Sequence, residues 1–285
     1  MKKLLLLLII VSCMILAIAC GGSDEETQKS GTLSFTLNAE DFVRDGFVSE
    51  DGWQIDFDHV YINVQGPTAF QVAETEAKLK DTPFKHAGHP HAEIPEGTAH
   101  VALTGAYFVD GHPGPDPIVI GQDAAAPIGN YNYINFNVVK ASSESAGLVA
   151  DYEGYSIVMI GTATKDDQSI SFNIKLDEEI EYTSCGPHPE SIGVVAENGK
   201  GEAQMTFHFD HIFGDFEEGP ADTTDEDAIN YVAVGFGPFA ELATDGALDI
   251  TQEDLKSIAV YDEFRYAMLT LGHNGEAHCN FEDQE

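Results

Sequence analysis

The segment TFHFDHIFGD (206–215) has the clearest capacity for chemistry, because it places two histidines and two aspartates among three phenylalanines. If it continues as a strand, His208 and Asp210 share one face, about 6.7 Å apart, and can converge on one ion. His211 then faces the core, where a neutral imidazole needs a hydrogen-bond partner or a metal. If the strand ends or bulges, His211 and Asp215 turn toward the same site. The alternative is a set of partly buried histidines that only make hydrogen bonds.

A second candidate cluster is LGHNGEAHC near the C-terminus, which contains His273, Glu276 and His278. The two histidines are five residues apart, outside the helical spacing of four, so a loop must bring them together. The two glycines give the backbone the freedom to wrap around a ligand. The alternative is a C-terminal segment that is held for stability and carries its histidines on the surface.

The tract KHAGHPHAE supplies three further histidines, His86, His89 and His91, in a segment broken by glycine and proline. Short histidine-rich tracts suit zinc, copper or nickel. Without a rigid scaffold their affinity for a metal is expected to be modest, and a solvated loop explains the same residues.

His59 lies in the strand-like segment GWQIDFDHVYI, where a spacing of two puts it on the same face as Trp53, Ile55 and Phe57. Strict alternation predicts that His59 points inward. FDHV here repeats FDHI at 209–212, so His59 and His211 are candidates to meet across the fold. The pattern alone favours a hydrogen-bonded core histidine over a metal ligand.

The N-terminus predicts export. Lys2 and Lys3 precede an apolar run that ends in LAIAC. The run is short for a membrane span. This ending resembles a bacterial lipoprotein signal, so we expect a signal peptide at 1–19, a lipidated Cys20 and a flexible polar tether at 20–31. The alternative is an ordinary secretory signal that is cleaved elsewhere. The folded domain is then 32–285.

Of the four cysteines, the signal removes Cys13 and the lipid uses Cys20, which leaves Cys185 and Cys279. In an oxidising compartment we expect these two to form a disulfide, with Cys279 as a thiolate metal ligand as the competing interpretation. A disulfide holds its two Cα atoms within about 7 Å, so it would also bring His278 close to His188 in the segment CGPH.

The formal net charge of −36 makes nucleic acid an improbable partner, because a strongly negative chain repels phosphates and concentrates cations. Adaptation to a salty habitat is an equally good explanation of this acidity. The sequence has no GxSxG, Walker loop, HExxH, CxxC or dinucleotide-binding fingerprint, so it offers no recognisable catalytic motif.

Alternation of apolar and polar residues between turn signals predicts a mainly β protein, an antiparallel β-sandwich of the immunoglobulin or jelly-roll kind. The clearest pair is IVMIGTATKDDQSISFNIKL, a hairpin with its turn at 165–168. Apolar residues spaced by three and four predict a helix over 252–271, with Thr251 as its N-cap and Gly272 as its stop. A shorter helix is expected near 224–232. These helices form a small C-terminal cap on the single domain.

The blocks TFHFDHIFGD, LGHNGEAHC and GWQIDFDHVYINV followed by AFQV resemble a family of uncharacterised bacterial lipoproteins that share them along nearly the whole mature chain. This resemblance implies lipidation and a common fold, and it implies no particular activity. More loosely, Trp53 and His59 resemble the tryptophan strand and inward histidine of the MbnP-type copper-binding periplasmic proteins. That likeness does not extend to a copper site or a modified tryptophan.

The hypothesis that follows is a protein that binds a divalent transition metal and is anchored by lipid in the cell envelope, facing the periplasm or the cell surface in a Gram-negative cell. Mixed imidazole and carboxylate ligands favour zinc, and copper and nickel also accept them. Its partners would be the membrane, through the anchor, and a metal transporter or other envelope protein. The rival is a structural or interaction module without metal. An enzyme would need a metal with an open position for water.

Overall fold

In the computed structural model the chain folds as a mainly β protein in which two large sheets pack face to face, which confirms the predicted β-sandwich. The structure describes residues 29–73, 78–80, 91–112, 117–188, 191–214 and 233–283. The predicted signal peptide, Cys20 and the helix expected near 224–232 lie outside these ranges. No helix within them is long and apolar enough to cross a membrane.

The first sheet has five strands, and the hairpin at one of its edges contains two of the candidate histidines, His273 and His278. Its strands β1 and β15 pair in parallel, although both flanking pairs, β1–β8 and β15–β17, are antiparallel. The strand order is β18 (Ala277–His278), β17 (Gly272–Asn274), β15 (Lys200–Phe207), β1 (Ser30–Asn38) and β8 (Ile118–Pro127). Strand β1 begins at Ser30, which pairs with Pro127, two residues before the predicted start of the folded domain.

The second sheet is larger, and the long strand β3 is its spine. The order along its path is β16 (Ala247–Thr251), β12 (Gln168–Leu176), β11 (Ile157–Lys165), β3 (Gln54–Phe70), β10 (Tyr133–Val138), β13 (Ile180–Cys185) and β19 (Asn280–Asp283). Three shorter strands also pair with β3, namely β2 (Phe47–Val48), β6 (His100–Ala102) and β7 (Ala106–Asp110). Two-stranded pairings join β9 (Gly129–Asn130) to β14 (Val194–Val195), and β4 (Lys78–Lys80) to β5 (His91–Glu93).

The hydrophobic core lies between the two sheets, as period-2 alternation requires. From the first sheet, Phe207 of β15 packs against Phe136 and Tyr182 of the second, with ring centroids 5.6 and 6.4 Å apart. Phe209, just beyond β15, reaches Phe57 on β3 at 6.4 Å. Each of these buried aromatic side chains contributes about 2 to 3 kcal/mol of hydrophobic free energy. The segment that carries the candidate histidines is therefore anchored by its phenylalanines.

The predicted hairpin is confirmed, with β11 and β12 paired from Ile157–Leu176 to Lys165–Gln168. The turn is tighter than expected, because only residues 166 and 167 lie outside the strands. Asp166 adopts a positive φ of 52°, which short polar side chains tolerate.

His59 is exposed, which contradicts the prediction that it points inward. A β-bulge in β3 is the reason: Phe57 pairs with Gly161 and His59 with Ile160, so Asp58 is an extra residue that reverses the alternation. The side chain of His59 is 46% exposed, and its Nδ1 lies 2.6 Å from an Asp110 carboxylate oxygen.

The predicted helix over 252–271 is two helices, α4 (Gln252–Leu255) and α5 (Tyr261–Leu269). Thr251 is the N-cap as expected, and its backbone N–H donates to the Asp254 carboxylate. The chain leaves α4 through consecutive bonds between residues three apart, such as Ile258 N–H to the Leu255 carbonyl, which tighten the turn and end the helix. Helix α5 ends before Thr270, ahead of the predicted stop at Gly272.

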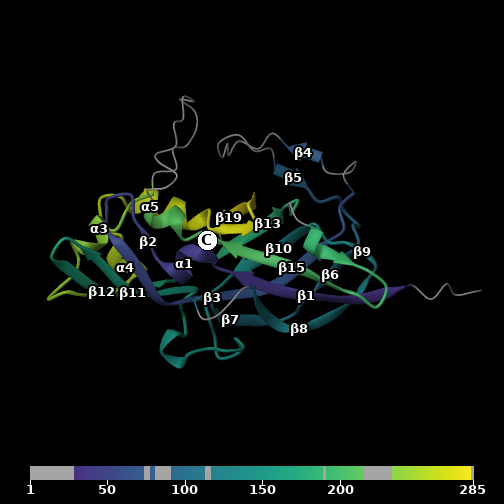
Figure 1. Cartoon of the computed structure of the whole chain (residues 1–285), viewed down its shortest axis with the longest axis horizontal. Coiled ribbons are helices and arrows are strands. Elements are labelled where there is room, and N and C mark those ends of the chain that lie inside the picture. Colours follow the sequence, from purple (N-terminus) through teal and green to yellow (C-terminus); the bar gives the residue numbers. More distant parts are fainter. Residues whose placement is uncertain are drawn as a thin grey trace, which may run out of the picture.

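The remaining helices are one or two turns long: α1 (Glu40–Asp45), α2 (Asp210–Phe213), α3 (Gly237–Ala240), and the 3₁₀ turns η1 (Ala150–Tyr152) and η2 (Ser191–Gly193). Helices α3, α4 and α5 gather at one end of the molecule in Figure 1. This is the expected helical cap.

The predicted disulfide is present between Cys185 and Cys279, with the Cα atoms 4.0 Å apart and both side chains buried. Cys279 lies where the chain leaves β18 in the first sheet and enters β19 in the second. Cys185 ends strand β13, and β19, which starts one residue after Cys279, pairs with β13. The disulfide therefore holds the β13–β19 junction at the point where the chain passes from the first sheet to the second.

Candidate metal centre

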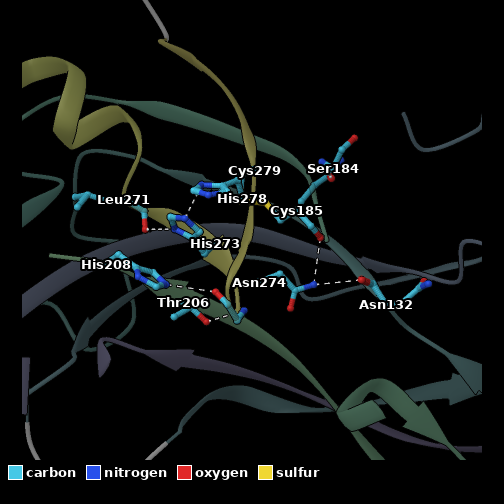
Figure 2. Close-up of a disulfide and its surroundings, with 12 residues drawn as sticks. Asn132, Ser184, Cys185, Thr206, His208, Leu271, His273, Asn274, His278 and Cys279 are labelled. Atoms are coloured by element: carbon cyan, nitrogen blue, oxygen red, sulfur yellow. Dashed lines mark hydrogen bonds between the residues drawn. A yellow bond between two sulfur atoms is a disulfide. The ribbon is translucent and has the colours of Figure 1, made fainter. Parts of the chain in front are cut away.

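Residues from two stretches of chain that are far apart in sequence meet at the edge of the first sheet. The end of β15 and helix α2 supply His208, Asp210 and His211, and the β17–β18 hairpin supplies His273 and His278. Figure 2 shows His208, His273 and His278 beside the Cys185–Cys279 disulfide. The ring centroids of His208 and His273 are 4.1 Å apart, and those of His273 and His278 are 4.5 Å apart. The two histidine clusters of the sequence are thus one cluster in the fold.

Strand β15 ends at Phe207, so the alternative in which the chain turns before His211 is the one observed. The backbone N–H of His208 still donates to the Leu271 carbonyl, and that of His211 folds back to the His208 carbonyl at 3.1 Å. Burial of Ile212 and Phe213 holds this turn and helix α2 against the core. His208 and His211 therefore face each other, with ring centroids 5.4 Å apart.

His208 is surrounded by oxygen atoms. Its Nε2 lies 3.4 Å from the Gly275 carbonyl oxygen, while its Nδ1 lies 3.3 Å from Glu40 Oε2 and 3.9 Å from Asp210 Oδ1. A neutral imidazole has one N–H and cannot donate in both directions. A cation on one ring nitrogen satisfies this arrangement, because the two carboxylates and the ring lone pair can all face it.

Thr270 fixes the tautomer of His211. The Thr270 hydroxyl donates to the Ala267 carbonyl at 2.8 Å, so its oxygen accepts a hydrogen bond from His211 Nδ1–H at 3.1 Å. In a neutral ring the lone pair is then on Nε2. Histidines that bind metals are commonly oriented in this way, with the second ring nitrogen donating to a protein oxygen.

His273 is turned toward protein groups on both sides. Its Nδ1–H donates to the Leu271 carbonyl at 3.1 Å, so its Nε2 accepts from His278 Nδ1–H at 2.8 Å (Figure 2). Burial lowers the pKa of His273 well below its usual value, and the neighbouring His208, His211 and His278 lower it further. His273 is consequently neutral near pH 7 and orients His278.

Two sets of donor atoms are close enough to share an ion. The donor atoms of His208, Asp210 and His211 lie within 4.8 Å of one another, and so do those of Glu40, His208 and Glu276. Ligands of one tetrahedral zinc are about 3.3 Å apart, so donor atoms that are still farther apart than this would move together when an ion binds. Imidazoles and carboxylates together suit zinc, copper or nickel.

The low pKa of His273 predicts that the metal-free protein loses stability in acid. The unfolded chain binds the proton near pH 6.5 and the folded chain only at lower pH, so the free energy of unfolding falls as the pH drops below about 6.5. Urea unfolding at a series of pH values should show this loss. His273→Asn, which keeps the donor to Leu271, should remove that part of the pH dependence; a variant with an unchanged slope would contradict it.

The other candidate residues lie outside this cluster or outside the residues that the structure describes. His59 contacts Asp110, so it does not meet His211. His188 lies against the hairpin turn, where its Nε2 would be 3.0 Å from a Cβ placed on Gly275. His91 lies in β5, whereas His86, His89 and Asp215 fall outside the described residues.

Sequence reasoning missed Glu40. It stands at the start of α1, directly after β1 and Ala39, and its carboxylate reaches His208. One acidic residue among 49 carries no signal of its own in the sequence. Only the parallel pairing of β1 with β15 brings Glu40 to the end of the histidine strand.

The sequence matches no protein-family model, and no curated protein or solved structure is significantly similar to it.

Proposed function

We propose that the protein binds one divalent transition metal, with zinc as the preferred ion and copper or nickel as alternatives. The observation that carries this proposal is the convergence of His208, Asp210 and His211, whose donor atoms lie within 4.8 Å of one another. Thr270 and Gly275 support it, because each faces the second ring nitrogen of a histidine, as in metal sites.

We further propose that the metal is bound outside the cytoplasm by a protein anchored to a membrane through lipid on Cys20, to buffer the ion or to deliver it to a transporter or another envelope protein. The lipoprotein-like N-terminus and the cysteine usage support this location. The net charge of −36 also supports the role, because it raises the local concentration of cations.

Elemental analysis of the exported, oxidised protein, purified without a histidine tag, tests the proposal. About one equivalent of zinc, copper or nickel should survive dialysis. Adding the metal back to protein stripped by a chelator should raise the melting temperature, because a ligand at a thousand times its Kd stabilises the folded state by about 4 kcal/mol.

A protein that carries no metal and shows no melting shift would overturn the proposal. The histidines would then be a hydrogen-bonded network, as their contacts with Leu271, Thr270 and each other also allow. The rival function, a structural or interaction module without metal, would follow.

A further inference from the structure

We propose that Glu40 is a ligand of the metal in this centre, and that the fold holds its backbone in a strained conformation to place the carboxylate there. This inference rests on the proposed function and adds a ligand from a segment far from the histidines in sequence. Three observations carry it: the position of the carboxylate, the chemistry around His208, and the backbone of Glu40.

The Glu40 carboxylate is well placed for a shared ion. Its Oε2 lies 3.3 Å from His208 Nδ1, and its side chain is only 17% exposed. The donor atoms of Glu40, His208 and Glu276 lie within 4.8 Å of one another. Glu276 is exposed on the hairpin turn, whereas Glu40 is the enclosed carboxylate of the pair.

The surroundings of His208 call for positive charge between its Nδ1 and two carboxylates. When Nε2–H donates to the Gly275 carbonyl, the Nδ1 lone pair faces Glu40 Oε2 at 3.3 Å and Asp210 Oδ1 at 3.9 Å. A divalent cation converts these repulsive contacts into ligation. Glu40 and the pair Asp210–His211 belong to two separate donor groups that share His208. In the proposed centre the two groups come together around His208, so that two imidazoles and two carboxylates would supply four donors and balance the charge of the ion.

The backbone of Glu40 has a φ of +64°, a conformation that is unfavourable for a residue with a long side chain. Asp166, Asn198 and Asp245 also have positive φ, but their short polar side chains tolerate it. The conformation of Glu40 is held in place by Asn38, whose side-chain oxygen accepts from Glu40 N–H at 2.8 Å. Backbone strain is typical of functional residues, and the strained residue here, Glu40, has its carboxylate directed at His208.

Arg44 adds to this support. Its Nη1 donates to the same Asn38 oxygen at 3.2 Å, one turn along α1 from Glu40. The Asn38 side chain is thus held by Arg44 as well as by Glu40. A residue of helix α1 therefore stabilises the turn at which that helix begins.

Glu40→Gln and Glu40→Gly test the proposal together. Both should weaken zinc binding to the full chain by at least about 10- to 100-fold, the loss typical of removing even a partner that only orients a ligand, in a competition titration with a chromophoric chelator. Both should also change the visible absorption of the Co²⁺-loaded protein, because a ligand is lost. Glycine favours a positive φ, so metal-free Glu40→Gly should melt no lower than the wild type. This variant separates the loss of a ligand from damage to the fold.

Glu202→Gln is the matched control, since it removes one negative charge from β15, where Glu202 accepts a hydrogen bond from Thr36 instead of facing His208. It should bind zinc as the wild type does. If both Glu40 variants bind zinc with wild-type affinity while His208→Ala does not, Glu40 is no ligand and the proposed function stands. If the wild type itself binds no metal, both proposals fail.

Discussion

Replacing His208 and His211 together with alanine should abolish tight zinc binding while leaving the protein folded. Structural zinc sites with four ligands contribute about 10 to 16 kcal/mol, so the loss of two imidazoles should cost about 5 kcal/mol, or more than a thousandfold in affinity. Isothermal titration of the metal-stripped protein with zinc measures this loss. The fold should survive because Phe207, Phe209 and Phe213 keep the segment packed into the core.

The matched control for this double variant is His59→Ala with His100→Ala. It also removes two imidazoles, but both of these are exposed, and His59 is paired with Asp110 away from the cluster. The control should retain wild-type affinity. Equal affinity in the His208/His211 variant and the control would show that zinc binds elsewhere, for example through the histidine-rich tract at 86–91.

Removing the disulfide with Cys185→Ala and Cys279→Ala should lower the free energy of unfolding by about 4 to 5 kcal/mol. The two cysteines are 94 residues apart in sequence. In the chain-entropy model, closing a loop of that length lowers the conformational entropy of the unfolded chain enough to stabilise the folded state by about this amount. Urea unfolding of the oxidised wild type and of the double variant, extrapolated to water, measures the difference.

Reduced wild type provides the comparison for that experiment, since it lacks the bond but keeps both sulfurs. When reduced under denaturing conditions and refolded in reductant, it should resemble the double variant. Both cysteines are buried, so mild reductant added to the folded protein should leave the bond intact. A double variant as stable as the oxidised wild type would mean that other contacts already restrict the unfolded chain or hold the β13–β19 junction.

The regular strands could be predicted from the sequence because period-2 alternation reports burial directly. The hairpin β11–β12 and the aromatic residues of β15 follow from it. What could not be predicted was where alternation stops. The bulge at Asp58 depends on Gly161 in a neighbouring strand, where a Cβ would lie 2.2 Å from the Asp56 carbonyl. That constraint is non-local, so strict alternation placed His59 on the wrong side.

The candidate site was predictable in part, for a related reason. His208, Asp210 and His211 stand together in sequence, and the disulfide indicated that the C-terminal histidines are held in place. Glu40 was beyond prediction, because its position depends on the parallel pairing of β1 with β15. The break between α4 and α5 was also missed, since the apolar spacing that places Leu255 and Phe264 in the core continues across it.

The parallel pairing of β1 with β15 also determines how late the first sheet can form. Thr32 pairs with Lys200, so most of the chain must be synthesised before β1 gains its second neighbour. Contacts this distant in sequence make folding slow, because a large loop must close before the pairing contributes. Until then the edge of β1 that pairs with β15 is open, and apolar residues that the folded protein buries, such as Leu33 and Phe35, stay exposed. A chain that stops short of Lys200 should therefore aggregate through this strand.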